Sequence, residues 1–209
     1  MIHFTNAPAE LIEFTRIYLA VFYSLVAAFY TIRIILMKHS SSSELVFTGK
    51  SFCSTWWNHM TFRFFRIVIW MVCLFRLVIP SVDNYLGMIS SLEIYLIILA
   101  GNILLTIGFF STIVIHIRLG KDWRSGIDPD GPNKIISTGV YKFSRNPMFL
   151  CIVISQIGFF LALPSLFSLI CLTIGVYTLY RQVIAEEKHL MESFPIEFKN
   201  YSMQVHRWI

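Results

Sequence analysis

Residues 131–149 read GPNKIISTGVYKFSRNPMF and form the longest polar, turn-rich run in a chain that is otherwise mostly apolar. Two glycines and two prolines set turns in this run, and two lysines and one arginine give it positive charge. A polar segment that lies against membrane helices can offer backbone N–H and C=O groups to a polar ligand while an apolar partner approaches from the lipid. The stretch therefore predicts a ligand site at the edge of a helical membrane domain.

The composition of the whole chain favours one integral membrane unit. Of its 209 residues, 56% are hydrophobic and 14% are charged, and the mean hydropathy is +0.66. These values are too apolar for an ordinary soluble domain. The formal net charge of +5 does not indicate nucleic acid, because the basic residues form no stripe with interleaved aromatic residues. No nucleic-acid partner is expected.

Five apolar runs predict membrane-spanning helices, each of which needs roughly 20 residues. The runs cover residues 11–37, about 62–82, about 94–117, 148–163 and 165–184. Because only Pro164 separates the last two, they are expected to form a tight antiparallel hairpin. The expected fold class is all-α, a single polytopic membrane domain over 1–209. Three spans lie in 1–117, and 118–209 form a core of the hairpin and a cytosolic tail.

The distribution of lysine and arginine predicts the orientation of these spans. The segment before the first span, the loop near 83–93 and the turn at Pro164 contain none, whereas the other loops and the tail carry many. The positive-inside rule then places the N-terminus outside and the C-terminus in the cytosol. A bacterial inner membrane is expected, or the endoplasmic reticulum if the chain is eukaryotic. Arg76, inside the second span, is expected to snorkel toward the outer headgroups.

The cysteines and histidines indicate neither a metal site nor a disulfide framework. The four cysteines show no CxxC spacing, and no two histidines have the i, i+4 spacing with a carboxylate that a helical metal site needs. The cysteines are interpreted as small hydrophobic residues buried among the spans. No metal is expected.

Polar residues stand at both open ends of the expected hairpin. Arg145 and Asn146 precede the fourth span, and Glu186 and Glu187 follow the fifth. Since the turn is short, the two pairs are expected to emerge side by side at the headgroup level. Arginine suits a carboxylate and glutamate suits an ammonium group or ribose hydroxyls, so the pattern favours a zwitterionic ligand. The alternative is that these residues only mark the water boundary and that Asn-Pro starts a helix.

The order of these pieces resembles a known family. The run G-x-x-x-x-I-x-T-G-x-Y-x-x-x-R-N-P-M-F, an apolar hairpin, and then E-E-x-x-L-x-x-x-F-x-x-E-F-x-x-Y follow one another from residue 131 to residue 201. This order is similar to that of the membrane methyltransferases grouped with isoprenylcysteine carboxyl methyltransferase and phospholipid N-methyltransferase. The resemblance covers roughly 131–209 and reaches back to 119–123.

The resemblance implies S-adenosyl-L-methionine as the methyl donor, bound in the cytosolic C-terminal region without a Rossmann sheet. Residues 133–136 would contact it largely through their backbone, Tyr141 would pack on it or hydrogen-bond to it, and Glu186 would hold one of its polar groups. The cofactor-binding residues that the resemblance implies are Asn133, Lys134, Ile135, Ile136, Gly139, Tyr141, Asn146, Pro147, Met148, Phe149 and Glu186.

The expected function is methyl transfer from this donor to an O, N or S atom of a lipid-like acceptor. No residue has the character of a covalent nucleophile, so catalysis would rest on holding donor and acceptor in line. Arg145, Glu186 and Glu187 are the residues predicted to position polar groups. Arg181 is predicted to contact the acceptor, although in the isoprenylcysteine enzymes the substrate arginine falls on Gln182 of this chain.

Two other functions fit the same sequence. One is a membrane reductase of the sterol-reductase type, which has a similar C-terminal scaffold but binds NADPH and needs more cations for its phosphates. The other is a non-catalytic membrane protein in which the polar segment binds a partner. The sequence does not name the methyl acceptor or the oligomeric state.

Overall fold

The chain forms the helices that its apolar runs predict, in a computed structural model that describes residues 7–40, 46–129 and 131–209. The α-helices of these residues are α1 (Ala9–Ser40), α2 (Ser54–Val78), α3 (Tyr95–Leu119), α4 (Pro147–Ala162), α5 (Leu166–Ser193) and α6 (Pro195–Gln204). Shorter elements are the 3₁₀ helices η1 (Pro80–Tyr85), η2 (Ser90–Leu92), η3 (Gly120–Asp122) and η4 (Gly139–Lys142), and the strands β1 (Val46–Phe47) and β2 (Ser125–Gly126).

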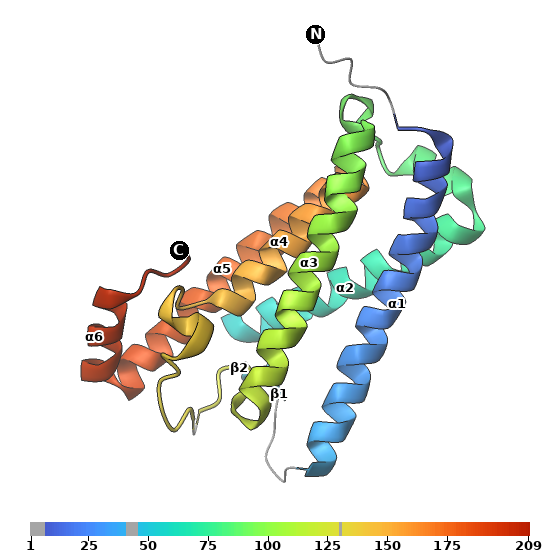
Figure 1. Ribbon diagram of the computed structural model, residues 1–209. Coiled ribbons are helices and arrows are strands. Elements are labelled where there is room, and N and C mark those ends of the chain that lie inside the picture. The colour runs from blue at the N-terminus through green and yellow to red at the C-terminus, as the bar shows by residue number, and fades with distance from the viewer. Residues whose placement is uncertain (1–6, 41–45, 130) are drawn as a thin grey trace.

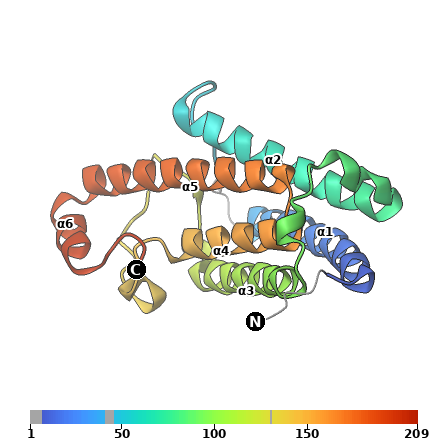
Figure 2. The ribbon, with the colours of Figure 1, turned by 90° about the horizontal axis from the view of Figure 1, so that it is seen from above.

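The five long helices pack as a bundle, and α6 stands apart at one end of it (Figure 1). Seen from above, α5 runs between α4 and α2, and α3 lies alongside α4 (Figure 2). Helix α5 extends past the start of α4 and carries α6 beyond it. The strands β1 and β2 pair in parallel and tie the chain before α2 to the chain after α3. The expected all-α polytopic membrane fold is confirmed.

Three helices of the described residues are long and apolar enough to cross a membrane: α1 over Ala9–Leu36, α3, and α5. The other two expected spans fall short of this standard. Helix α4 has 16 residues, which rise only about 24 Å, less than the roughly 30 Å of a bilayer core. Helix α2 carries Arg63, Arg66 and Arg76, and it runs over Ser54–Val78 instead of the expected 62–82. It starts early because no glycine or proline interrupts the aromatic-rich segment before residue 62.

The hairpin of α4 and α5 is as tight as the single proline predicts. Ser165 and Ser168 form a reciprocal capping box at the start of α5, in which each hydroxyl accepts the other residue's backbone N–H at 3.2 Å. The loop between α2 and α3 closes over this turn, where Ile89 N donates to Pro164 O at 2.8 Å. The buried turn therefore satisfies its own polar groups and anchors a neighbouring loop.

The segments without lysine or arginine share one end of the bundle. Ala7 N donates to Glu93 O at 2.9 Å, so the chain before α1 lies against the α2–α3 loop, which in turn covers the Pro164 turn. The part of the N-terminal segment before residue 7 lies outside the described residues. The polar segments gather at the opposite end, where α3 ends, α4 begins and α5 continues into α6 (Figure 1).

The expectation that Arg76 snorkels toward the headgroups is wrong. Arg76 is only 2% exposed, and its guanidinium donates to both carboxylate oxygens of Asp83. Arg16 of α1 donates to the same carboxylate at 2.9 Å. Asp83 lies in η1, which folds back over the end of α2, and this return of the chain could not be inferred from the apolar run. Burial alone would raise the pKa of Asp83, but Arg76 and Arg16 hold that pKa below its usual value.

Helices α3 and α4 pack with their backbones in contact. A Cβ atom placed on Gly158 would lie 2.2 Å from the backbone nitrogen of Leu105, and one on Gly101 would lie 2.3 Å from that of Ala162. Gly158 and Ala162 are four residues apart and form a small-xxx-small pair on α4. Such pairs let membrane helices approach closely enough for extensive van der Waals contact.

Replacing Gly158 by alanine should therefore weaken the bundle by about 1–3 kcal/mol, the usual cost of overpacking. The matched control is Gly175→Ala on α5, where the three atoms nearest to a Cβ would all belong to the flexible amide of Gln156. The control should be close to neutral, because the amide can move and alanine is up to about 1 kcal/mol the better helix former. Thermal unfolding in detergent micelles compares the two variants. Equal melting temperatures would contradict this account of the α3–α4 interface.

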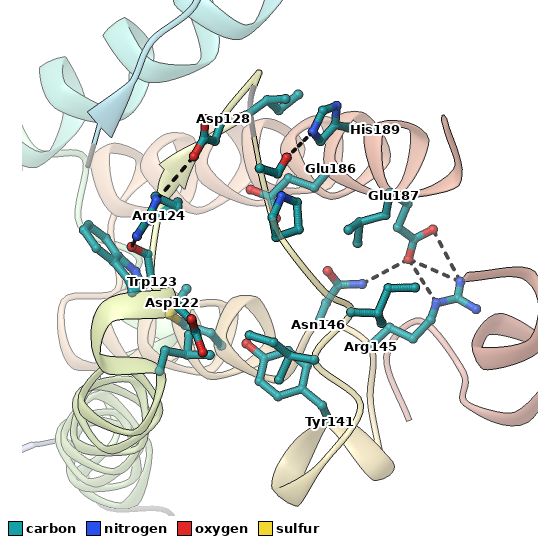
Figure 3. Close-up of a pocket in the computed structure, with 18 of the residues that line it drawn as sticks. Asp122, Trp123, Arg124, Asp128, Tyr141, Arg145, Asn146, Glu186, Glu187 and His189 are labelled. Atoms are coloured by element: carbon teal, nitrogen blue, oxygen red, sulfur yellow. Dashed lines mark hydrogen bonds and ion pairs between the residues drawn. The ribbon is translucent and has the colours of Figure 1, made fainter. Parts of the chain in front are cut away.

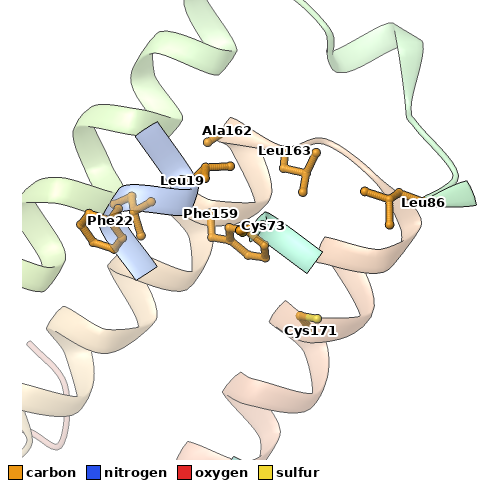
Figure 4. Close-up of a cluster of buried hydrophobic side chains, with 9 residues drawn as sticks. Leu19, Phe22, Cys73, Leu86, Phe159, Ala162, Leu163 and Cys171 are labelled. Carbon is orange, nitrogen blue, oxygen red and sulfur yellow. The ribbon is translucent and has the colours of Figure 1, made fainter. Parts of the chain in front are cut away.

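The main hydrophobic core lies toward the end of the bundle that contains the Pro164 turn (Figure 4). It joins five helices and the loop after α2. Its buried residues are Leu19, Phe22, Cys73, Leu86, Leu105, Phe159, Ala162, Leu163 and Cys171. The interpretation of cysteines as small buried hydrophobic residues is confirmed for Cys73 and Cys171, both free thiols. With the core at this end, the opposite end of the bundle is left open for cavities.

Candidate functional site

The two open ends of the hairpin meet, as the sequence predicts. Arg145 Nε and Nη2 donate to the two carboxylate oxygens of Glu187 at 3.2 and 3.3 Å. Asn146 Nδ2 donates to Glu187 Oε1 at 3.1 Å. Figure 3 shows these side chains facing each other across the mouth of the hairpin. The Arg-Asn corner and the glutamate pair therefore share one rim.

The C-terminal tail completes this cluster, which the sequence did not predict. Arg207 Nη2 donates to Glu187 Oε2 at 2.8 Å. Arg145 Nη1 also donates to the carbonyl oxygens of Ser202 and Val205 at 3.0 and 3.1 Å. Glu187 thus joins the start of α4, the end of α5 and the tail after α6. We call these interacting residues, Arg145, Asn146, Glu187 and Arg207, the rim cluster.

A cavity that we call the outer pocket lies beside the rim cluster. It contains about 1050 Å³ of space, a value that includes the part open to solvent. Its apolar wall includes Ile135, Ile136, Met148, Phe149 and Leu190. Its polar lining residues are Asp122, Arg124, Asp128, Lys134, Tyr141, Arg145, Asn146, Glu186, Glu187, His189 and Tyr201. Apolar walls with a few convergent polar groups are typical of a site for a mixed polar and apolar ligand.

The polar segment 131–149 is held against α5 and α6 by specific hydrogen bonds. The Nε2 atom of His189 lies 2.7 Å from Gly131 O, and the hydroxyl of Tyr201 donates to Tyr141 O at 2.7 Å. Burial, reinforced by the charge of Glu186, raises the pKa of Tyr141 well above its usual value. The Tyr141 phenol therefore stays protonated and available as a hydrogen-bond donor at the pocket wall.

Glu186 differs from its neighbour Glu187 in its surroundings. Its Oε1 accepts a hydrogen bond from Gln182 Nε2 at 2.9 Å. In the described ranges no cation pairs with it, whereas Glu187 is paired twice. Glu186 also lines a second cavity deeper in the bundle. It is therefore the carboxylate best placed to meet a ligand.

The structure brings most of the predicted site residues to the outer pocket. Those that line it are Lys134, Ile135, Ile136, Tyr141, Arg145, Asn146, Met148, Phe149, Glu186 and Glu187. Arg145 and Glu187 spend much of their hydrogen-bonding capacity on each other and on the tail. Their direct contact with a ligand stays a prediction, and their observed contacts hold the rim together.

Four predicted residues do not line the pocket. Asn133 is exposed, and Pro147 is buried in the first turn of α4. Gly139 starts η4 with a φ of +63°, a conformation that favours glycine, so it shapes a turn rather than a wall. Arg181 donates to the hydroxyl of Ser54 on α2, and it lines neither the outer pocket nor the deeper cavities. Its neighbour Gln182 lines the deeper cavity instead.

Sequence reasoning assigned no role to several residues of the pocket. The end of α3 and the segment that follows it supply seven wall residues between Leu119 and Asp128, and the end of α5 and α6 add Leu190 and Phe198. The resemblance reaching back to 119–123 was the available signal for part of this segment. Leu190, Phe198 and Tyr201 stand at fixed positions of the second motif, so the resemblance was the available signal for them too.

Two further cavities follow the outer pocket into the bundle. The first, which we call the inner chamber, shares with it Trp123, Arg124, Gly126, Met148, Phe149 and Glu186. The second, the apolar cavity, shares with the inner chamber Tyr30, Phe62, Arg66 and Ile152. The three spaces thus adjoin in a row that leads from the polar end of the bundle toward its hydrophobic core.

Comparison with known proteins agrees with this geometry. The sequence model of the phospholipid methyltransferase family matches residues 96–196, which include most of α3, the polar segment and the α4–α5 hairpin. Over this part the chain is similar to the phospholipid methyltransferase family, and the resemblance to the membrane methyltransferases is confirmed. No curated protein and no solved structure matches the chain. The family and the three membrane-length helices make this an integral membrane protein.

Proposed function

We propose that the protein transfers a methyl group from S-adenosylmethionine to a lipid-like amphiphile. The observation that carries this proposal is the row of cavities. A pocket for a polar donor adjoins, through Glu186, Met148 and Phe149, a chamber that leads on to an apolar cavity within the bundle. A donor and an amphiphilic acceptor could therefore meet at this boundary, away from bulk water.

The residues of the outer pocket fit the methyl donor. Ile135, Ile136 and Phe149 supply an apolar surface for an adenine ring. In its ionised form the carboxyl of Glu186 would attract the donor's ammonium or sulfonium group, and it could accept hydrogen bonds from the ribose hydroxyls. The pocket is built from a loop and helix ends, so it needs no Rossmann sheet.

Catalysis would come from position rather than from a covalent intermediate. The bound donor supplies a methyl group on a sulfonium: a lone pair of the acceptor forms the new bond to carbon as the S–C bond breaks and leaves its electrons on sulfur. The chain's own residues would align the two reactants. Glu186 would orient the donor at the boundary between the pockets, Met148 and Phe149 would keep water from that boundary, and the rim cluster would hold the start of α4 against α5.

We place the polar end of the bundle in the cytosol, and the end with the Pro164 turn on the outer side. Support comes from the clustering of all three lysine- and arginine-free segments at that end. A soluble donor would then enter from the cytosol. A bacterial inner membrane is the proposed location, with the endoplasmic reticulum as the eukaryotic counterpart.

The cations of the outer pocket argue against NADPH as its ligand. Arg145 pairs with Glu187, and Arg124 pairs with Asp128 at 3.4 Å. Among the described residues that line the pocket, Lys134 is the remaining lysine or arginine. A dinucleotide with several phosphates usually requires more unpaired positive charge than this. The pocket therefore favours the sulfonium donor over the nicotinamide nucleotide.

Calorimetry on the protein in nonionic detergent tests the proposal directly. S-adenosylmethionine and its demethylated product should bind, and NADPH should not. Membranes that contain the protein, incubated with methyl-labelled donor, should yield label in the extracted lipid fraction. Binding of NADPH alone would support the reductase. Binding of neither, with no label transferred, would support a non-catalytic protein.

A further inference from the structure

We propose that the inner chamber binds the acceptor's headgroup, that this headgroup is negatively charged, and that Arg63 and Arg66 of α2 recognise it. The apolar cavity would hold the acceptor's chain. This inference rests on the proposed function and goes beyond it, because it assigns a chemical class to the acceptor. It also assigns recognition to a helix that precedes the part of the chain that matches the family, residues 96–196.

The charge of the inner chamber favours an anion. Arg63, Arg66 and Arg124 line it, and Glu186, at its boundary with the outer pocket, is the single carboxylate among the described residues that do so. Arg124 already pairs with Asp128. Neither Arg63 nor Arg66 forms an ion pair with a carboxylate anywhere in the described part of the chain. Both side chains are exposed where they line the chamber, and two arginines without a counter-ion can pair there with a carboxylate or phosphate group.

Buried polar atoms without partners point to a ligand in the same chamber. His116 is 1% exposed, its ring lies 4.3 Å from that of Trp123, and neither of its nitrogens has a hydrogen-bond partner within the described chain. The Nε2 atom of His59 is likewise buried and unpartnered. Both histidines line the inner chamber. Unpaired buried polar groups are costly in folded proteins, and a polar group or a water bound in the chamber would complete these hydrogen bonds.

The arginines stand where a headgroup would join its chain. The guanidinium of Arg66 lies over the ring of Tyr30, 4.7 Å from its centre, and both residues line the inner chamber and the apolar cavity. Beyond this point the cavity wall is mainly aromatic and aliphatic, with Phe22, Phe109 and Phe159 among its residues. A negative head held at Arg66 would therefore direct an apolar chain into the bundle.

The position of the chamber also places the head beside the methyl donor. Glu186, Met148 and Phe149 separate the inner chamber from the outer pocket and line both. An acceptor bound through Arg63 and Arg66 would thus present the region around its headgroup to the donor side. Helices α1 and α2 would then determine which amphiphile is methylated, and residues 96–196, which match the family, would bind the donor.

Three probes with the same sixteen-carbon chain test the headgroup: hexadecyl phosphate, palmitate and hexadecyltrimethylammonium. In nonionic detergent, one or both anionic probes should bind the wild-type protein at least tenfold more tightly than the cation. The comparison of the two anions identifies a phosphate or a carboxylate as the preferred group. The Arg63→Gln/Arg66→Gln variant should lose about tenfold or more of the affinity for the preferred anion. Higher salt should weaken anion binding by the wild type.

The control variant is Arg118→Gln, an exposed arginine at the end of α3 that lines none of the three cavities. It should keep the affinity for the anion. Binding of S-adenosylhomocysteine and the melting temperature should stay unchanged in the double glutamine variant. If that variant is unstable, Arg63→Lys/Arg66→Lys takes its place, and it should retain a preference for anions over the cation.

Equal binding of anionic and cationic probes by the wild type would overturn the inference, and so would undiminished anion binding in a folded glutamine variant. Loss of the anion preference in a folded lysine variant would count against it equally. These outcomes are distinct from failure of the proposed function. If the wild-type protein binds the anion but not the donor, the proposed anionic site stands and the proposed methyltransferase function fails. If the wild-type protein binds the donor but does not prefer the anion, the proposed methyltransferase function stands and the proposed anionic site fails.

Discussion

The Glu187→Gln substitution is expected to lower the free energy of unfolding by about 3 kcal/mol. That value is at the lower end of the cost of breaking a buried ion pair, because the side chain of Arg207 is 34% exposed and remains partly hydrated. The side chains of Arg145 and Glu187 are each only 12% exposed. With glutamine at 187, two guanidinium groups and the Asn146 amide would share one neutral acceptor, and the glutamine NH₂ would oppose other donors.

Denaturant-induced unfolding in mild detergent, followed by circular dichroism, measures this loss. The matched control is Glu192→Gln, five residues further along α5. Glu192 pairs with Lys188 at 3.8 Å, and their side chains are 64% and 76% exposed, so its loss should be nearly silent. Trypsin should also cleave after Lys199 faster in the Glu187 variant, because the tail has lost its anchor. If the two variants unfold at the same denaturant concentration, the rim cluster does not hold the tail.

The Glu186→Gln substitution should act on ligand affinity rather than on the fold. Glutamine can still accept the hydrogen bond from Gln182, and no ion pair among the described residues is broken. On the proposed function, loss of the negative charge removes a charge-assisted contact with the donor worth about 1.5–3 kcal/mol. The affinity for S-adenosylmethionine should then fall by a factor of roughly 10 to 150.

Calorimetry with S-adenosylmethionine compares this variant with the wild type and with Glu192→Gln, which makes the same change outside the pocket. The melting temperature of the Glu186 variant should stay close to that of the wild type. Unchanged donor affinity would remove Glu186 from the donor site and would favour the reading in which the polar segment binds a protein partner. The substitutions of the two neighbouring glutamates are therefore expected to have different effects: the change at Glu186 lowers donor affinity, and the change at Glu187 lowers stability.

Sequence reasoning found the site because its main determinants are local. The turn at Pro164 joins two helices that must run back along each other, so Arg145 and Glu187 had to end at one rim. The three segments without lysine or arginine were likewise predicted to lie on one side of the membrane, and they share one end of the bundle. Residues of the pocket wall such as Ile135 and Met148 followed from the motif order. Each of these inferences depends on helix geometry and on the order of residues along the chain.

Other features depended on contacts between distant segments. Arg76 finds its carboxylate in Asp83, which a 3₁₀ turn brings back over the end of α2. The position of Arg181 along α5 suggested contact with the acceptor, but its side chain lies on the face of the helix toward Ser54 and lines none of the cavities. Helical spacing alone does not reveal which neighbour a face will meet.

The amino-acid sequence by itself determined the apolar helices, the hairpin and the rim where its polar ends meet, because hydrophobic period, turn residues and span length act over short distances. Only the tertiary structure showed that the tail closes the rim through Arg207. It alone also showed that Arg63 and Arg66 line a chamber between α2 and residues 96–196. The physical reason is that cavities and buried charge pairs arise where several helices pack together. Their composition is set by which side chains remain between the helices once the backbones are in contact.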